Sequence, residues 1–249
     1  FKKPQAFHNS PTPIIGGLSI FLSFLLVYLY LFLFQNIIYY EYISFSILFF
    51  LLGFADDLKI NLRPKMRLGL MILFLVLLIN YNNFYIEKTG IEILNNWLDE
   101  SNIFSVLFIG LCFLFIINGA NLIDGYNGLL GFHSLIIILN LFFVNYINKN
   151  YNLAFLLLSS TLIFLVFIVF NFPKAKLFLG DGGSYLLGIF LALSAIKTSI
   201  LNPTVSPFYF CILLSYLFFE VFFSFIRKLL IKKTLPLLSD QDHLHILIY

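Results

Sequence analysis

The sequence predicts an all-α, polytopic integral membrane protein with about eight transmembrane helices. Of its 249 residues, 61% are hydrophobic and only 11% are charged, whereas soluble domains carry about 25% charged residues. A soluble fold of this size would leave too much apolar surface in contact with water. The composition therefore excludes a soluble enzyme, a disordered chain and a disulfide scaffold, and the net charge of +3 gives no indication of a nucleic-acid partner.

Eight stretches are apolar enough to be membrane helices, which need about 20 mostly apolar residues. They are apolar on all sides, so a transmembrane barrel, whose strands alternate apolar and polar residues, is not expected. The stretch over 38–55 fits least well, because Glu41 lies near one end. The predicted spans of this single transmembrane domain, residues 1–249, are 14–34, 38–55, 67–85, 103–120, 129–147, 153–172, 182–199 and 207–228.

The distribution of Lys and Arg predicts the orientation of the chain. With eight spans, both ends of the chain lie on the same side of the membrane. Twelve of the 15 Lys and Arg residues fall on that side, and the positive-inside rule assigns it to the cytoplasm. The cytoplasmic segments are 1–13, 56–67, 121–128, 173–181 and 227–249.

Six of the seven Asp residues fall in the same cytoplasmic segments, and only Asp99 lies on the other side. Charged groups near the ends of membrane helices are unfavourable unless they are solvated, paired or used. Short acidic side chains that converge on one face favour a hard cation, which prefers oxygen ligands. We therefore expect a cation site at the cytoplasmic boundary.

Asp56 and Asp57 end the second predicted span, and the basic residues Lys59, Arg63 and Lys65 follow at once. Adjacent residues on a helix point about 100° apart, so one carboxylate is expected to bind metal while the other meets the substrate. The basic residues favour a phosphate-rich substrate beside the acid pair. An ordinary basic cytoplasmic loop is the alternative.

The segment INGANLIDGYNGLLGF, residues 117–132, carries the strongest polar pattern in the chain. Asn118, Asn121 and Asp124 recur every three residues, which places their oxygens near one face of a helical turn. Asn127 offers both a donor and an acceptor, which suits the edge of a nucleotide base. Amides in a membrane-buried turn are unfavourable without partners, so this segment is expected to bind a ligand.

Two further segments carry candidate groups. In KAKLFLGDGGSYLLG, residues 174–188, Asp181 lies among glycines at the start of a span. A helix N-terminus there would favour phosphate, and a simple turn capped by Asp181 is the alternative. Near the end of the chain, His243 and His245 are two residues apart, and we expect them to contact phosphate or pyrophosphate rather than zinc. Glu220 lies within a span, where it either forms a structural hydrogen bond or positions the site.

These motifs resemble those of the polyprenyl-phosphate N-acetylhexosamine-1-phosphate transferases, within the glycosyltransferase family 4 superfamily. The matching pieces, in family order, are PTPIIGG, GFADD, NGANLIDGYNGLLG, FLGDGGSYLLG, RKLL and DQDHLH. The resemblance implies transfer of a sugar-1-phosphate from a UDP-N-acetylhexosamine to undecaprenyl phosphate with release of UMP. It further implies Mg²⁺, or Mn²⁺ in its place, and a multi-pass protein in the bilayer of the bacterial inner membrane. The active site would face the cytoplasm, and the reaction would initiate the synthesis of a cell-envelope polysaccharide such as O-antigen. A homodimer is a further expectation.

Taken with the oxygen pattern, the resemblance predicts a role for each candidate residue. The expected catalytic residues are Asp56, Asp57, Asp124 and Asp181, and the expected metal ligands are Asp181 and Asn121. The expected substrate-binding residues are Asn118, Asn127 at the uracil, Arg227, Lys228, His243 and His245.

Two other functions stay open. Phospho-MurNAc-pentapeptide transferases of the same family carry three consecutive histidines where this chain reads HLHI, and an Asp at the position of Asn127. Both differences favour the hexosamine branch. An ion-coupled transporter would place its acids near the bilayer midplane, whereas here they lie at span ends. Family members also have one more helix before this region and one or two after it, so we expect the chain to be a fragment.

Overall fold

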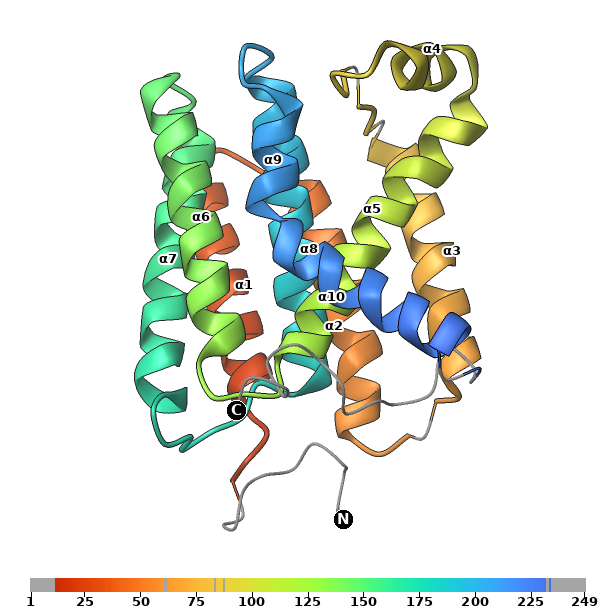
Figure 1. Ribbon diagram of the computed structural model, residues 1–249. Helices are drawn as coiled ribbons and strands as arrows, with labels where there is room; N and C mark the ends of the chain where they lie inside the picture. Colours follow the sequence, from red (N-terminus) through yellow and green to blue (C-terminus); the bar gives the residue numbers. More distant parts are fainter. Residues whose placement is uncertain (1–11, 61, 83, 87, 232, 234–249) are drawn as a thin grey trace.

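The computed structural model describes residues 12–60, 62–82, 84–86, 88–231 and 233 of the chain. Within these residues the fold is entirely helical, as the sequence predicts. Most of the helices run lengthwise through one bundle (Figure 1). They are α1 (Gly16–Gln35), α2 (Tyr40–Asp57), α3 (Pro64–Asn82), α4 (Glu92–Glu100), α5 (Asn102–Ile123), α6 (Leu129–Ile147), α7 (Tyr151–Asn171), α8 (Gly180–Leu201), α9 (Pro207–Leu213), α10 (Ser215–Ile226) and the π-helix η1 (Arg227–Ile231).

Six of these helices, α1, α3, α5, α6, α7 and α8, are long and apolar enough to cross a membrane. The predicted span over 207–228 is broken into two helices, α9 and α10, which meet at a bend of 65° and together are long and apolar enough to form a seventh span. The helix at the predicted span 38–55, α2, carries three acidic residues, Glu41, Asp56 and Asp57, so composition alone does not make it a membrane span. The chain is thus a multi-pass membrane protein, and α2 depends on its neighbours to be held in the bundle.

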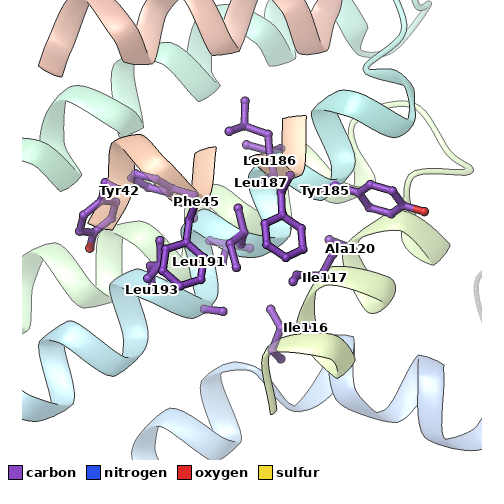
Figure 2. Close-up of a cluster of buried hydrophobic side chains, with 14 of the residues drawn as sticks. Tyr42, Phe45, Ile116, Ile117, Ala120, Tyr185, Leu186, Leu187, Leu191 and Leu193 are labelled. Atoms are coloured by element: carbon purple, nitrogen blue, oxygen red, sulfur yellow. The ribbon is translucent and has the colours of Figure 1, made fainter. Parts of the chain in front are cut away.

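The helix α8 forms the centre of the bundle. It contacts α1, α2, α5, α6 and α9, and most of its side chains are buried. Figure 2 shows Leu187 and Leu191 of α8 among Phe45 of α2 and Ile117 of α5, all of them buried core residues. Because apolar neighbours surround α8 on several sides, the rest of the bundle fixes the position of its first turn.

Two glycines allow α1 and α2 to approach the first turn of α8 closely. A Cβ atom on Gly53 of α2 would lie 2.3 Å from the backbone oxygen of Asp181, and one on Gly17 would lie 2.5 Å from the backbone nitrogen of Gly183. The backbone N–H of Gly17 also donates to the carbonyl of Leu179 at 2.9 Å. Any side chain at Gly17 or Gly53 would push the start of α8 away.

The end of the bundle away from the first turn of α8 is held by polar contacts that are buried or partly buried. Glu41 of α2 forms an ion pair with Lys197 of α8. Asn145 of α6 donates through Nδ2 to the hydroxyl of Thr198 at 2.8 Å, and Asn202 donates to Oδ1 of Asn145 at 3.2 Å. These groups satisfy one another, as polar groups removed from water must.

Candidate active site

The end of the bundle at which α2 and α5 end and α8 begins holds four of the predicted catalytic and metal-binding residues. Asp56 and Asp57 are the last two residues of α2, and Asn121 lies in the last turn of α5. Asp181 lies in the first turn of α8. Figure 1 shows the ends of these helices converging at the same end of the bundle.

Asp57 caps the first turn of α8. Its Oδ1 accepts a hydrogen bond from the backbone N–H of Asp181 and its Oδ2 accepts one from Gly182, both at 2.9 Å. Gly180, whose φ is +78°, turns the chain into the helix. A Cβ atom there would lie 2.7 and 2.9 Å from the two carboxylate oxygens of Asp57.

This cap corrects one expectation from the sequence. The free N–H groups and the dipole at a helix N-terminus stabilise an anion, and we expected a substrate phosphate to be that anion. For the N–H groups of Asp181 and Gly182 this is wrong, because the carboxylate of Asp57 already accepts from both.

Asp56 faces a different partner, as helix geometry requires of adjacent residues. Its carboxylate forms an ion pair with the guanidinium group of Arg67, in the first turn of α3. The central carbon of that guanidinium lies 5.7 Å from the centroid of the Tyr185 ring, which is a cation–π distance. The two acids therefore have different partners: Asp57 caps the first turn of α8, and Asp56 forms an ion pair with Arg67.

Asn121 and Asp181 are in direct contact across the α5–α8 interface. The Nδ2 of Asn121 donates to Oδ1 of Asp181 at 3.0 Å and to the hydroxyl of Ser184 at 2.9 Å. The Ser184 hydroxyl in turn donates to the backbone carbonyl of Asp181 at 3.1 Å. The two residues expected to hold a metal therefore meet, although they are 60 positions apart.

The oxygens of Asp181 and Asn121 are the donors that this arrangement offers to a hard cation. Across the part of the chain that the structure describes, no three Asp, Glu, His or Cys side chains form a metal-binding group. Mg²⁺, however, usually takes one or two protein carboxylates and completes its shell with water and phosphate oxygens. A carboxylate beside an amide oxygen fits such a site, in which substrate phosphates supply the remaining ligands.

Amides fasten the α5–α6 connection to the α7–α8 connection. Asn127 donates to the carbonyl of Pro173 at 3.1 Å. The buried Asn171 accepts from the N–H of Gly128 at 2.5 Å and donates to the carbonyl of Leu177 at 2.9 Å. Sequence reasoning missed Asn171, because a single Asn at the end of an apolar run resembles any helix end.

The remaining predicted residues lie elsewhere in α5, directly after it, in η1 or outside the described residues. Asn118 donates to the carbonyl of Leu114 in its own helix at 2.8 Å. Asp124 directly follows α5 at the same end of the bundle. Arg227 and Lys228 begin η1, where Lys228 is buried. His243 and His245 lie outside the described residues.

Known proteins are similar in sequence to the region of the chain that builds this site. The family model described as glycosyl transferase family 4 matches residues 39–199. A Thermotoga maritima protein named undecaprenyl-phosphate alpha-N-acetylglucosaminyl 1-phosphate transferase is 31% identical over 238 residues, which cover 96% of this chain and 68% of that protein. A phospho-N-acetylmuramoyl-pentapeptide-transferase of Dictyoglomus thermophilum is 34% identical over 250 residues, which cover 95% of this chain and 75% of that protein.

A protein of the same name from Dictyoglomus turgidum is 34% identical over 206 residues, which cover 79% of this chain and 61% of that protein. The chain thus spans about two thirds of the length of the curated relatives it matches. The region matched by the family model runs from the start of α2 through most of α8, and it contains Asp56, Asp57, Asn121 and Asp181. This chain therefore belongs to glycosyl transferase family 4.

Proposed function

We propose that this protein transfers an N-acetylhexosamine-1-phosphate from a UDP-sugar to undecaprenyl phosphate and releases UMP. The proposal rests on the contacts among Asn121, Asp181 and Asp57, here called the junction. They bring side-chain oxygens that can bind a cation together at one end of the bundle. The name of the Thermotoga maritima relative supports this choice of substrates. The proposed location is the bacterial inner membrane, with the junction facing the cytoplasm.

In the proposed reaction, an oxygen of the lipid phosphate attacks the phosphorus of the sugar-1-phosphate. A new P–O bond joins the two phosphates, the pyrophosphate bond of the UDP-sugar breaks, and UMP leaves with the bridging oxygen and its electron pair. A phosphate monoester has a second pKa of about 6, so the nucleophile is largely dianionic at neutral pH and needs no strong base. We infer a single displacement, and a phosphorylated enzyme trapped during turnover would contradict it.

Repulsion between the two anionic substrates is the main barrier that the protein must lower. Mg²⁺ held by Asp181 and Asn121 would neutralise charge on the pyrophosphate when it is bound. Asn121 orients the Asp181 carboxylate through the 3.0 Å hydrogen bond. Arg67 adds positive charge beside the site, and the exposed Arg63 and Lys65 in the same segment attract phosphates towards it.

The helix α10 offers an apolar surface for the polyprenyl tail. After the 65° bend, α10 packs on α5 and runs obliquely across the bundle towards the lower part of α3 (Figure 1). Phe219 and Phe223 are exposed on α10, with ring centroids 5.5 Å apart. A lipid chain that lies against these rings would stay in the bilayer while its phosphate reaches the polar boundary.

A second candidate function is transfer of phospho-MurNAc-pentapeptide to the same lipid. The two Dictyoglomus relatives that bear this name are each 34% identical to the chain, a similarity of the same order as that to the Thermotoga maritima protein. The two reactions share the lipid acceptor and the released UMP, so they differ only in the donor.

A donor panel tests both candidates. The purified chain is incubated with undecaprenyl phosphate and with UDP-GlcNAc, UDP-GalNAc or UDP-MurNAc-pentapeptide, and released UMP is measured with Mg²⁺, with Mn²⁺ and with EDTA. We expect release from a UDP-N-acetylhexosamine that EDTA abolishes and added Mg²⁺ restores. At a limiting Mg²⁺ concentration, Asn121→Ala should lose most of this activity, whereas Asn140→Ala, which removes an exposed amide bonded only to its own helix, should keep it.

The other outcomes are equally specific. Release from UDP-MurNAc-pentapeptide alone would establish the second candidate instead. If no donor yields UMP and proteoliposomes take up a labelled ion, both proposed enzyme activities would be wrong and the protein would be a transporter.

A further inference from the structure

Tyr185 lies in the second turn of α8, directly after Ser184, whose hydroxyl is bonded to Asn121. Its side chain is fully buried. Figure 2 shows the Tyr185 ring pointing away from the apolar cluster around Leu187 and Leu191, with the hydroxyl at its far end. The ring therefore leaves the core on the side where the polar residues of α8 begin.

The Tyr185 hydroxyl is a buried polar group without a hydrogen-bond partner among the described residues. Two other buried tyrosines do have one: the hydroxyl of Tyr42 bonds to Ser194 and that of Tyr28 to Ser46, both at 3.3 Å. A buried hydroxyl that forms no hydrogen bond destabilises the fold. A Phe would fill the same space without that cost, so packing does not account for a Tyr here.

The surroundings of the ring are those of the candidate active site. The guanidinium carbon of Arg67 lies 5.7 Å from the ring centroid. Asp181, Asp56 and Asp57 all lie within electrostatic reach of the phenol. Each of these carboxylates already accepts a hydrogen bond, from Asn121, from Arg67 and from the start of α8 respectively. The phenol is thus an unused donor beside acceptors that already have partners.

We propose that Tyr185 is a further substrate-binding residue, whose hydroxyl donates a hydrogen bond to a phosphate oxygen of the bound substrate. The proposal rests on the proposed function, which brings two phosphate groups to this end of the bundle. Arg67 lies over the ring, so a phosphate that draws the guanidinium away from Asp56 also uncovers the phenol. A neutral hydrogen-bond donor suits this place. Unlike a cationic side chain, it can bind phosphate without forming an ion pair with the nearby carboxylates.

The test compares Tyr185→Phe with Tyr42→Phe. The second variant is a matched control, because it also removes a buried hydroxyl, one that donates to Ser194 of α8. The kcat and KM for the UDP-sugar and for undecaprenyl phosphate are measured separately, together with the Tm of each variant. For Tyr185→Phe we expect kcat/KM to fall about tenfold or more, with an unchanged or higher Tm. For Tyr42→Phe we expect a lower Tm and unchanged kinetics.

The two substrate arms identify which phosphate is bound. A higher KM for the UDP-sugar places the hydroxyl on the donor pyrophosphate, a higher KM for the lipid places it on the lipid phosphate, and a lower kcat alone places it on a phosphate oxygen in the transition state. Wild-type kinetics in Tyr185→Phe would overturn the proposal. A Tm loss as large as that of Tyr42→Phe would also overturn it, because the hydroxyl would then have a structural partner. Failure of the wild-type chain to release UMP is a separate result, which would remove the proposed function and this inference with it.

Discussion

Replacing Asp57 with Asn should destabilise the protein more than its partly exposed position suggests. The carboxylate accepts two backbone hydrogen bonds of 2.9 Å, from Asp181 and Gly182. Hydrogen bonds to a charged group contribute about 1.5–3 kcal/mol each, and a neutral one contributes about 1 kcal/mol. Asn keeps one acceptor oxygen but turns an NH₂ group towards the other N–H. The difference is about 2–5 kcal/mol, and the lower end applies because Asp57 is partly exposed, so we expect a loss of about 2 kcal/mol.

The assay is thermal unfolding of the purified chain. For a protein of this size, 1 kcal/mol corresponds to about 2–4 °C in Tm, so Asp57→Asn should lower Tm by about 4–8 °C. Asp56→Asn is the matched control, because it makes the same change at the adjacent residue. Its partly exposed partner Arg67 can turn to water, so we expect a loss of about 1 kcal/mol or less. Equal Tm values for the two variants would refute the cap.

Three further perturbations test other parts of the structure. Gly53→Ala places a methyl group 2.3 Å from a backbone oxygen of α8, so it should lower the free energy of unfolding by at least about 1–3 kcal/mol. Gly69→Ala is the control: a Cβ atom there has nothing within 4 Å, so its Tm should be unchanged or higher. Equal Tm values for the two variants would contradict the close approach of α2 to α8. Asn121→Ala should raise the Mg²⁺ concentration for half-maximal UMP release about 10-fold to 100-fold, and an unchanged Mg²⁺ requirement would remove this residue from the metal site. Glu41→Gln leaves Lys197 without its counter-ion, but this pair is as exposed as Arg67–Asp56, so the change should cost about 1 kcal/mol or less. Glu41→Leu combined with Lys197→Met should recover that loss, and a double variant as unstable as the single one would argue against the pair.

The contact between α5 and α8 was within reach of sequence reasoning. Asn121 and Asp181 stand at the ends of apolar helices, where polar side chains need partners, and they do meet at 3.0 Å. The divergence of Asp56 from Asp57 likewise follows from helix geometry. The roles of these residues in binding metal and substrate stay predictions.

The capping of α8 by Asp57 could not be predicted from the sequence. Helix-start rules consider the residue just before a helix, which here is Leu179 with no side-chain cap. The capping carboxylate comes from Asp57, 124 positions earlier, so only the packing of α2 against α8 creates it.

The bend between α9 and α10 was also hidden, because residues 208–228 contain neither Gly nor Pro. The packing of α10 against α5 favours it instead. A Cβ atom on Gly119 of α5 would lie 2.3 Å from the backbone oxygen of Leu217 in α10. The short helix α4 was missed because its polar composition resembles that of a loop.

The ion pair at the far end of the bundle has a consequence for biosynthesis. Glu41 and Lys197 are 156 positions apart, so α2 leaves the ribosome long before its counter-charge has been translated. A carboxylate at the end of a membrane helix is unfavourable unless it is solvated or paired, so Glu41 of α2 has only water as a partner until Lys197 arrives. The arrival of α8 supplies the ammonium group together with the apolar surface that α2 packs on. The packing of α2, an early helix, is therefore completed by α8, a late one.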